Sequence, residues 1–543
     1  MNKLTAAALI CILSIAPIIA QEKSKPNVLF IAVDDLKTVL GCYGDKIIKT
    51  PNIDRLAKMG TVFLNNYCQQ AVCGPTRASL LTGMRPDVTK IRDLHTKMRD
   101  INPDIVTLPE YFISQGYTTS GIGKIFHPSC VDKKFDPQSW SIPFLVAKES
   151  DYSNGLPVQK HYQSPELKAL NTKEEVVSAV EDGKGKGKKK GEKKSKKEAD
   201  DEEGARGPAF ECIDLPDDAY DDGVSAKLAA KQIEMLNAAK KPFFMAVGFR
   251  KPHLPFVSPK KYWDLYKRED MPVAEFQEHA ANSKIFSYQY PGELTNYAGV
   301  KEFAKFDKNE ANEFGLAIEK QKELIHAYYA AVSYTDAQIG ILLNTLEKLG
   351  TLNNTIIVLW GDHGWHLGDH DMWGKHTNYE QATKAPLIIA APGLKAGQTK
   401  SMTEFVDVFP TLCELSGGEV PAYLDGKSLV QVMKNNKASV KEYAMSQYPR
   451  KMDKADINKV EDGKGKLMGY SMRTEQYRYT VWLKNFTSDQ AYSADKVYTK
   501  ELYDYVKDPL EKVNVSDDTK YAAIVADLDK KMVAYFKSKE VKL

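Results

Sequence analysis

The chain has 543 residues, too many for one compact hydrophobic core, so we expect two domains or one large domain with a smaller satellite. Its hydrophobic share of 43% and aromatic share of 10% are those of an ordinary globular protein. Lys and Arg number 75 against 72 Asp and Glu, and the resulting net charge of +3 excludes a global field that would demand nucleic acid or a membrane surface as partner.

The first 20 residues have the pattern of a secretory signal peptide. Lys3 supplies the positive charge, residues 4–20 are apolar, and Ala20 precedes a plausible cleavage point. The apolar run is short for a membrane span, and no second candidate follows it. We therefore expect export to the periplasm or the medium of a bacterial cell without stable membrane insertion; an uncleaved anchor is the alternative.

Four apolar segments farther along the chain each begin as a buried strand and end in charged or metal-binding residues. In chain order these end residues are Asp34 and Asp35, then Lys124 and His127, then Arg250, Lys251 and His253, and finally Asp362 and His363. Helical patterns lie between them, for example over residues 224–239 and 317–349. Alternating strands and helices predict a parallel α/β sheet covered on both faces, whose ligands bind at the carboxyl ends of the strands. One such cluster could be a solvated strand end, but four together favour a site.

Between the first two of these segments lies AVCGPTRASLLTG, residues 71–83. Pro75 suits the first turn of a helix and Gly83 suits the position just past its end. Cys73 would then sit at the positive end of the helix dipole, with Arg77 one turn farther in, which predicts a thiolate rather than a thiol. A buried structural cysteine is the alternative.

The cysteines define no disulfide framework. Export permits disulfides, yet the spacing of the cysteines shows no scaffold pattern, so their pairing stays open. Six lie beyond the predicted signal peptide, at positions 42, 68, 73, 130, 212 and 413. If Cys73 has a chemical role, at least one other is unpaired.

Two composition changes suggest the domain organisation. Residues 181–209 are lysine-rich and then acidic, with almost nothing apolar, which predicts a disordered surface insertion, or alternatively a lysine tract that attracts an anionic polymer. A polar stretch near Asn436 predicts the end of a catalytic domain over residues 21–436. Residues 437–543 alternate as antiparallel strands and finish with an amphipathic helix from Tyr521, which predicts a small α+β subdomain.

Taken together, these motifs resemble the type I, formylglycine-dependent sulfatases, which have the alkaline-phosphatase-like fold. The most specific motif is Cys73-x-Pro75-x-Arg77, followed by Leu-Thr-Gly over residues 81–83. Longer stretches, including LGCYGDKIIKTPNIDRLA, AVGFRKPHLPF and GDHGWHLGDHDMWGKHTNYEQAT, are most similar to the iduronate-2-sulfatase branch of that family. The similarity runs from about Asn27 to the end of the chain, apart from the lysine-rich insertion. It implies a large, mostly parallel sheet between helices and a smaller C-terminal subdomain.

The resemblance also implies a cofactor chemistry. In such enzymes a formylglycine-generating maturation enzyme oxidises the motif cysteine during export, so Cys73 would become Cα-formylglycine, whose hydrate attacks the sulfate ester. One Ca²⁺ would be bound by Asp34, Asp35, Cys73, Asp362 and His363. Carboxylates suit Ca²⁺ or Mg²⁺, whereas the histidine alone would also suit Zn²⁺, so here the resemblance decides.

The remaining motif residues receive their roles by the same resemblance. Arg77 and Lys124 would hold the developing oxyanion, and His127 would accept the proton that releases sulfate. His253 and Lys375 would bind sulfate oxygens, with His253 the candidate acid for the leaving alcohol. Trp365, His366 and His376 are weaker candidates for sugar contacts, and a tryptophan packed in the core is the alternative.

The expected substrate is a sulfated oligosaccharide or polysaccharide, with uronate 2-O-sulfate the first choice. Marine algal polysaccharide is the alternative substrate. A phosphatase or phosphonate monoester hydrolase on the same fold, and a glycan-binding protein with an inactive site, are the competing functions.

Overall fold

The computed structural model describes residues 25–169, 206–289, 292–300, 315–451, 466–484 and 492–540. The predicted signal peptide over residues 1–20 lies outside these ranges. So does the predicted lysine-rich insertion up to residue 205.

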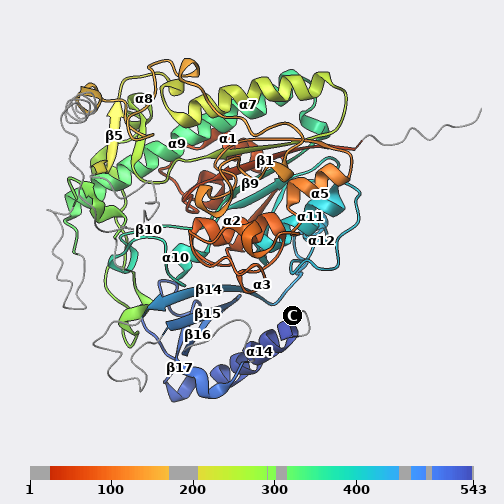
Figure 1. Cartoon of the computed structure of the whole chain (residues 1–543). Helices are drawn as coiled ribbons and strands as arrows, with labels where there is room; N and C mark the ends of the chain where they lie inside the picture. Colours follow the sequence, from red (N-terminus) through yellow and green to blue (C-terminus); the bar gives the residue numbers. More distant parts are fainter. Residues whose placement is uncertain are drawn as a thin grey trace, which may run out of the picture.

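A seven-stranded sheet forms the centre of the larger part of the molecule (Figure 1), with the strand order β13-β2-β12-β9-β1-β6-β3. Within this sheet β12 runs antiparallel to both of its neighbours, whereas every other neighbouring pair is parallel. The predicted, mostly parallel sheet is thereby confirmed. Its strands are β1 Asn27–Val33, β2 Thr61–Tyr67, β3 Thr118–Gly123, β6 Phe243–Phe249, β9 Thr355–Gly361, β12 Leu387–Ala390 and β13 Gly397–Glu404.

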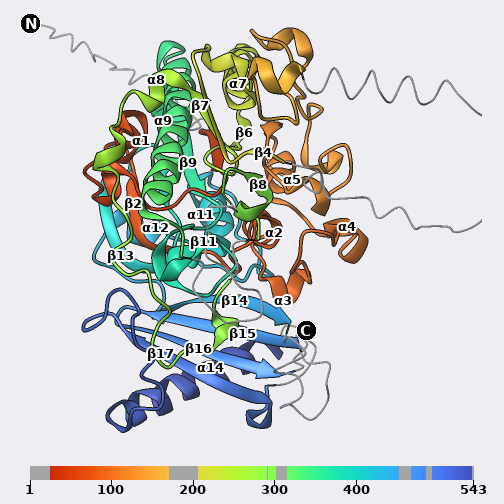
Figure 2. The same ribbon diagram turned by 90° about the vertical axis from the view of Figure 1, so that its left-hand side faces the viewer.

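Helices cover both faces of this sheet (Figures 1 and 2). Strand β1 shows why, because its buried side chains alternate between two hydrophobic cores. Leu29, Ile31 and Val33 face the core under α7 and α9, and Val28 and Phe30 face the core under α2, α5 and α11. The α-helices are α1 Pro51–Ala57, α2 Cys73–Thr82, α3 Pro86–Thr89, α4 Met98–Ile101, α5 Leu108–Ser114, α7 Asp221–Ala238, α8 Lys260–Trp263, α9 Ile318–Lys348, α10 Glu380–Thr383, α11 Val408–Leu415, α12 Val430–Lys434 and α14 Ala522–Glu540.

The four strands that the sequence singled out are neighbours in the sheet. They lie in the order β9-β1-β6-β3 and all run parallel, so their carboxyl ends meet at one edge. The clusters that follow these strands are therefore brought together, although more than 300 positions separate Asp34 from Asp362. This arrangement is what positions the candidate site.

A second, four-stranded antiparallel sheet lies below the first part in Figures 1 and 2, with α14 on its outer side. Its strands are β14 Tyr443–Lys451, β15 Lys466–Thr474, β16 Tyr477–Lys484 and β17 Val497–Asp504. Strand β14 is the one nearest the larger part. The antiparallel strands and the terminal helix agree with the expected subdomain, while its boundary after residue 436 stays a prediction.

Short pairs of strands complete the described chain. They are β4 Arg206–Pro208 with β8 Tyr297–Ala298, β5 Phe210–Ile213 with β7 Phe256–Pro259, and β10 His366–Leu367 with β11 Trp373–Gly374. The first pair corrects the predicted insertion at its end. Ala209 is buried and its carbonyl accepts a hydrogen bond from Phe256 N at 2.8 Å, so residues 206–209 are part of the ordered fold. Composition missed this because a short strand takes its partners from elsewhere in the chain.

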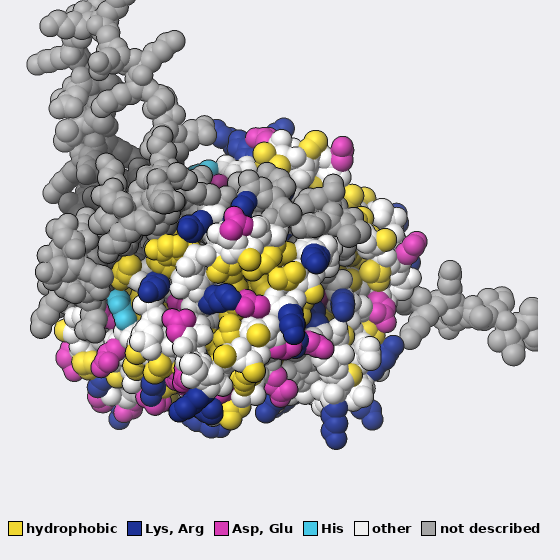
Figure 3. All heavy atoms as spheres, turned by 90° about the horizontal axis from the view of Figure 1, so that it is seen from below, with side chains coloured by type: hydrophobic (Ala, Val, Ile, Leu, Met, Phe, Trp, Pro, Cys, Tyr) yellow, Lys and Arg dark blue, Asp and Glu magenta, His cyan; other side chains and the backbone are white. Residues whose placement is uncertain are grey.

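The surface seen from below, the side of the small sheet and α14, carries Lys and Arg side chains interspersed with Asp and Glu (Figure 3). On the described part of this face, neither charge gathers into a single large patch. No helix in the described ranges combines the length and the apolar character needed to cross a bilayer.

Candidate active site

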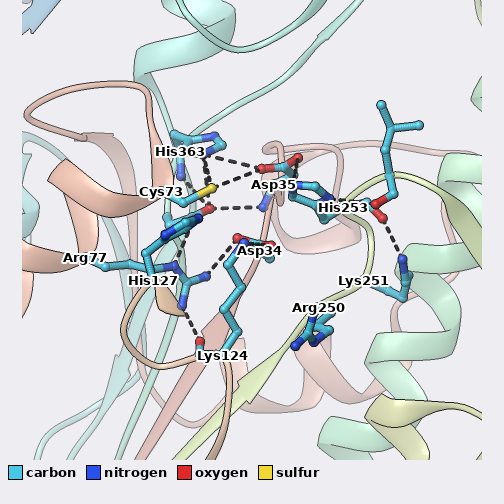
Figure 4. Close-up of polar contacts among 12 residues, drawn as sticks. Asp34, Asp35, Cys73, Arg77, Lys124, His127, Arg250, Lys251, His253 and His363 are labelled. Atoms are coloured by element: carbon cyan, nitrogen blue, oxygen red, sulfur yellow. Dashed lines mark hydrogen bonds and ion pairs between the residues drawn. The ribbon is translucent and has the colours of Figure 1, made fainter. Parts of the chain in front are cut away.

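Cys73 is the first residue of helix α2 and comes directly after the extended Val72. Gly83 follows the last residue of the helix, with a φ of 66°, the left-handed conformation that glycine adopts readily. The Cys73 Sγ atom lies 3.3 Å from His363 Nε2, 3.7 Å from Lys375 Nζ and 3.9 Å from Asp35 Oδ1. The predicted helix is confirmed, and the cysteine faces the cluster at the strand ends (Figure 4).

The expected thiolate is wrong for this cysteine as the chain stands. Cys73 is only 2% exposed. Burial, and then the charge of Asp34, raise the pKa of its thiol well above the usual value, although Lys124 and Lys375 oppose this. The dipole of α2 is outweighed because the thiol is desolvated beside carboxylates. None of the six cysteines in the described part of the chain is in a disulfide.

The carboxylates and the histidine of the predicted metal site converge around this thiol. His363 Nε2 lies 3.4 Å from Asp35 Oδ1 and 3.6 Å from Asp362 Oδ1. One ligand atom from each of Asp35, Cys73, Asp362 and His363 lies within 4.8 Å of the others, and all four residues are buried. Burial and the Gly364 carbonyl fix the histidine: its Nδ1 contacts Gly364 O at 3.0 Å, and burial lowers its pKa to about 4, which keeps Nε2 free as a neutral ligand.

The electrostatics of these groups suit a bound divalent cation. Burial raises the pKa of Asp35 well above its usual range, Lys375 opposes this, and the nearby Asp34, Glu293 and Asp362 charges raise it further. Carboxylates held together in a buried site repel one another until a cation joins them. The donor set, with three aspartates and one neutral histidine, therefore fits a metal ion with oxygen preference.

Arg77 and Lys124 are the cationic side chains that contact the aspartates of the site. Arg77 is fully buried and pairs with Asp34 at 3.0 Å and with Asp362 at 2.9 Å, while its Nη1 donates to the Lys124 carbonyl. Lys124 Nζ lies 2.5 Å from Asp34 Oδ2. Burial alone would raise the pKa of Asp34, but Lys124 and Arg77 outweigh it and hold this pKa well below its usual range. Asp34 is therefore a carboxylate at neutral pH.

Lys375 and His253 approach from the other side. Lys375 Nζ lies 2.8 Å from Asp35 Oδ1, and His253 Nε2 lies 3.8 Å from Asp35 Oδ2. Glu293 adds an unexpected carboxylate, with one oxygen 3.3 Å from His253 Nε2 and the other 3.6 Å from Lys375 Nζ. The two groups that the resemblance assigns to sulfate, the Lys375 ammonium and the His253 imidazole, thus face an anion of the chain itself. No periodicity or motif in the sequence distinguishes this glutamate.

The ring of His253 is oriented by its own loop. Its Nδ1 contacts Leu254 O at 2.7 Å, and Lys251 Nζ donates to His253 O at 2.8 Å and to Pro255 O at 2.6 Å. Burial and then Lys375 lower the pKa of His253 well below its usual value. In the neutral ring, Nδ1 carries the proton and Nε2 faces the site (Figure 4).

His127 lies in the loop that follows β3, beside Arg77 in Figure 4. Burial and then Lys124 lower its pKa to about 2, so its ring is neutral. Its Nδ1 accepts a hydrogen bond from Ser129 N at 3.3 Å, which places the ring proton on Nε2. The orientation of the His127 ring is thus supported by a backbone amide of its own loop.

The three candidate sugar contacts differ in position. Trp365 is 1% exposed, and its ring lies 5.2 Å from Lys375 Nζ. His366 is 0% exposed and contacts Thr377 Oγ1 at 3.0 Å. Both positions favour the alternative of packing inside the core. His376 is partly exposed, and its Nδ1 contacts Tyr448 Oη at 2.7 Å.

A tyrosine of helix α9 supports the loop after β1, and no motif in the sequence points to it. Asp35 has a φ of 55°, an uncommon conformation for a residue other than glycine. Tyr328 Oη donates to Asp35 O at 2.7 Å and accepts from Lys37 N at 2.9 Å. This hydroxyl therefore bridges two backbone groups of the strained loop and supports the residue that carries the Asp35 carboxylate.

Comparison with known proteins agrees with this geometry. The profile of the Sulfatase family matches residues 26–418, and that of the N-sulphoglucosamine sulphohydrolase C-terminal region matches residues 368–538. Human iduronate 2-sulfatase is 32% identical, with 91% of each chain covered. A sulfatase of Formosa agariphila is 31% identical, over 94% of this chain and 87% of its own.

Two solved structures share the fold at low sequence identity. One, determined in complex with its substrate D-glucosamine-2-N,6-O-disulfate, has a TM-score of 0.65 at 21% identity and covers 96% of this chain and 98% of its own. The phosphonate monoester hydrolase of Agrobacterium radiobacter also has a TM-score of 0.65, at 22% identity, over 95% of this chain and 96% of its own. The family profile, the relatives and the fold agree: the chain belongs to the sulfatase family, the sulfuric ester hydrolases of the alkaline-phosphatase-like fold.

Proposed function

We propose that this sulfatase is exported, that Cys73 is matured to Cα-formylglycine by a formylglycine-generating enzyme, and that it removes sulfate from a sulfated glycan with one bound Ca²⁺. The supporting observation is the convergence on the Cys73 thiol of His363 Nε2 at 3.3 Å and Asp35 Oδ1 at 3.9 Å. A helix N-terminus, carboxylates and buried cations meet there as a matured nucleophile would require.

The residues that would hold Ca²⁺ are Asp34, Asp35, the matured residue 73, Asp362 and His363. When bound, Ca²⁺ would polarise a sulfate oxygen and favour the ionised form of a hydroxyl on residue 73. Maturation replaces a thiol by a hydrated aldehyde, which offers one hydroxyl for attack on sulfur and a second whose deprotonation expels sulfate.

The other residues manage charge and protons. Arg77 and Lys124 lie against Asp34 and would stabilise the oxyanion that develops on residue 73. His127, a neutral imidazole, would take the proton whose removal releases sulfate. If Nε2 is the accepting atom, the ring proton must first lie on Nδ1, in the tautomer opposite to the one that the Ser129 contact favours.

Lys375 and His253 would contact the sulfate oxygens. Glu293 must then yield its contacts with both of them to the incoming group. A bound sulfate would favour the protonated form of His253, which then protonates the leaving alcohol.

The proposed substrate is a glycan with a uronate 2-O-sulfate, since human iduronate 2-sulfatase is 32% identical over 91% of both chains. The decisive experiment measures hydrolysis of a 2-O-sulfated uronate disaccharide, a 6-O-sulfated glucosamine and an aryl sulfate beside the corresponding aryl phosphate. We expect turnover of the sulfates, with preference for the uronate. A faster reaction with the phosphate would favour the phosphatase or phosphonate hydrolase alternative.

Maturation has its own test. Mass spectrometry of the peptide containing residue 73 should show the loss of sulfur expected for an aldehyde, and Cys73→Ala should lower kcat/KM by about 10,000-fold or more. Undiminished turnover by Cys73→Ala would contradict the proposed nucleophile.

The signal peptide over residues 1–20 and the domain boundary after residue 436 belong to the same proposal. N-terminal sequencing of the exported protein tests the signal peptide, and limited proteolysis tests the boundary.

A further inference from the structure

One arginine of the small sheet lies beside the candidate active site and forms no ion pair with a carboxylate of the residues that the structure describes. Arg450, near the end of β14, donates from Nε to Phe286 O at 2.6 Å and from Nη2 to His376 O at 2.5 Å. Its guanidinium stacks 4.3 Å from the centre of the Tyr448 ring. His376 follows Lys375 in the chain, so these contacts place Arg450 against the segment that carries a proposed sulfate ligand.

The other arginines of this sheet are bound differently. Arg473 pairs with Glu380 at 3.0 Å, and Arg478 pairs with Glu511. Burial alone would lower the pKa of both arginines, but these carboxylates outweigh it and raise the pKa. For Arg450 burial outweighs the opposing influence of Tyr448 and Glu501, and its pKa is lowered. Among the residues that the structure describes, the hydrogen bonds of Arg450 all go to neutral carbonyl oxygens. A partly buried guanidinium that hydrogen-bonds only to neutral oxygens gains stability when a ligand brings an anion into direct contact with it.

The geometry of the guanidinium shows where such a ligand would bind. Nε and Nη2 form one edge of the planar group, and this edge is used by the two backbone carbonyls. The opposite edge, between Nη1 and Nη2, has one further contact, with Pro449 O at 3.5 Å, too long for a strong hydrogen bond. Two parallel N–H groups therefore remain, in the arrangement that binds a carboxylate or sulfate in bidentate fashion.

The neighbours keep this arginine in place and leave the residue partly exposed. Tyr448 Oη contacts His376 Nδ1 at 2.7 Å, so the strand and the Lys375–His376 segment are linked through side chains as well as through the guanidinium. Arg450, Tyr448 and His376 are all partly exposed. Because β14 is the strand of the small sheet nearest the larger part (Figure 2), this cluster lies where the two parts meet.

We propose that Arg450, supported by Tyr448 and His376, is a substrate-binding residue that holds a second acidic group of the glycan, the carboxylate of the sulfated uronate. This subsite rests on the proposed sulfatase function and deepens it: Lys375 and His253 take the sulfate, and the adjacent segment takes the carboxylate. The small sheet thereby contributes to substrate choice. A sulfate on the neighbouring sugar has the same bidentate chemistry and is the other source of the anion.

The test compares substrates that differ in one acidic group. They are a 2-O-sulfated uronate disaccharide, the same disaccharide with its carboxylate reduced to an alcohol, a disaccharide of neutral sugars with a second sulfate on the neighbouring unit, and an aryl sulfate. We expect the wild-type protein to favour the first. Arg450→Gln should lower kcat/KM for the uronate by about 10- to 100-fold, mainly through KM. For the reduced disaccharide and the aryl sulfate, it should change kcat/KM by less than about threefold.

Two further variants make the outcome interpretable. Arg450→Lys keeps a positive charge but cannot make the bidentate contact of a guanidinium, so its kcat/KM for the uronate should lie between those of wild type and Arg450→Gln. If Arg450→Gln does not fold, the comparison of Arg450→Lys with wild type is the test. Arg55→Gln is the matched control, because Arg55 of α1 pairs with Glu347 of α9 at 3.0 Å and both side chains are partly or largely exposed. This control should leave all substrates unchanged.

Each other result overturns the assignment. An equal loss of kcat/KM on all four substrates would show that Arg450 only positions the His376 segment. A loss confined to the doubly sulfated substrate would show that Arg450 binds the sulfate of the neighbouring sugar and not the carboxylate. Wild-type protein that hydrolyses aryl sulfate but does not distinguish the uronate from its reduced form would refute this inference alone. Absence of any sulfate ester hydrolysis by matured protein would refute the proposed function itself.

Discussion

Glu380 joins the small sheet to the larger part of the molecule, and its replacement by glutamine is a sharp test of the structure. Glu380 is the first residue of α10, and Arg473 of β15 donates from Nε to its Oε2 at 3.0 Å. Its Oε1 accepts from Tyr67 Oη at 2.9 Å. The side chains of the ion pair are only 9% and 14% exposed. Glu380→Gln keeps the shape and removes the charge, which leaves the buried Arg473 without its counter-ion.

The size of the effect follows from the pKa. Burial alone would raise the pKa of Glu380, but Arg473 and Lys384 outweigh it and lower the pKa from 4.5 to about 2. A carboxyl whose pKa is lower in the folded than in the unfolded chain stabilises the folded state at every pH above the unfolded-state pKa. This contribution is lost as the pH falls from about 4.5 towards 2. At about 1.4 kcal/mol per pKa unit, the charge of Glu380 contributes about 3 kcal/mol at neutral pH.

The assay is urea unfolding of wild type and Glu380→Gln, followed by circular dichroism at several pH values. The difference in unfolding free energy should be about 3 kcal/mol at pH 7 and should shrink to about 1.5 kcal/mol at pH 3, because the wild type has then lost part of its advantage. The exposed pair of Arg55 and Glu347 provides a control, since Glu347→Gln should change stability by less than about 1 kcal/mol. A loss for Glu380→Gln that is below about 1 kcal/mol, or equal at pH 7 and pH 3, would refute the reasoning.

Three further predictions concern the active site. Asp362→Asn should weaken Ca²⁺ binding at least about 10-fold in calorimetry and abolish the rise in melting temperature on adding Ca²⁺, because a buried ligand loses its charge. Tyr328→Phe should weaken Ca²⁺ binding by about 10-fold, because the hydroxyl that fixes Asp35 is lost. Gly74→Ala should lower the free energy of unfolding in urea by about 1–3 kcal/mol, since the added Cβ would lie 2.7 Å from Cys130 Sγ.

Matched variants separate these effects from general damage. The Tyr329 hydroxyl donates to Asp45 Oδ2 at 3.1 Å, so Tyr329→Phe should leave the Ca²⁺ affinity unchanged. Gly397→Ala should be tolerated, because the atom nearest to the added Cβ would be Asn436 Nδ2 at 3.4 Å, an ordinary contact distance. Unchanged Ca²⁺ affinity in Asp362→Asn would contradict the proposed set of metal ligands. Equal weakening of Ca²⁺ binding by Tyr328→Phe and Tyr329→Phe would contradict the role of the Tyr328 hydroxyl. A Gly74→Ala protein as stable as the wild type would contradict the predicted clash at Cys130.

The sequence determined the larger sheet and the composition of the site. Buried parallel strands are near-continuous apolar runs, so β1, β3, β6 and β9 could be recognised, and the polar residues that follow them had to meet at one edge. The cysteine motif marks its own helix, since proline near the start and glycine after the end are local signals. These features need no knowledge of distant contacts.

The tertiary structure alone decided how those residues are held and what else joins them. The high pKa of the Cys73 thiol, the approach of Glu293 to His253, the support of Asp35 by Tyr328 and the place of Arg450 beside His376 each depend on segments far apart in the chain. Such contacts have no period and no spacing, because burial and Coulomb interactions depend on distance in space and not on separation along the sequence.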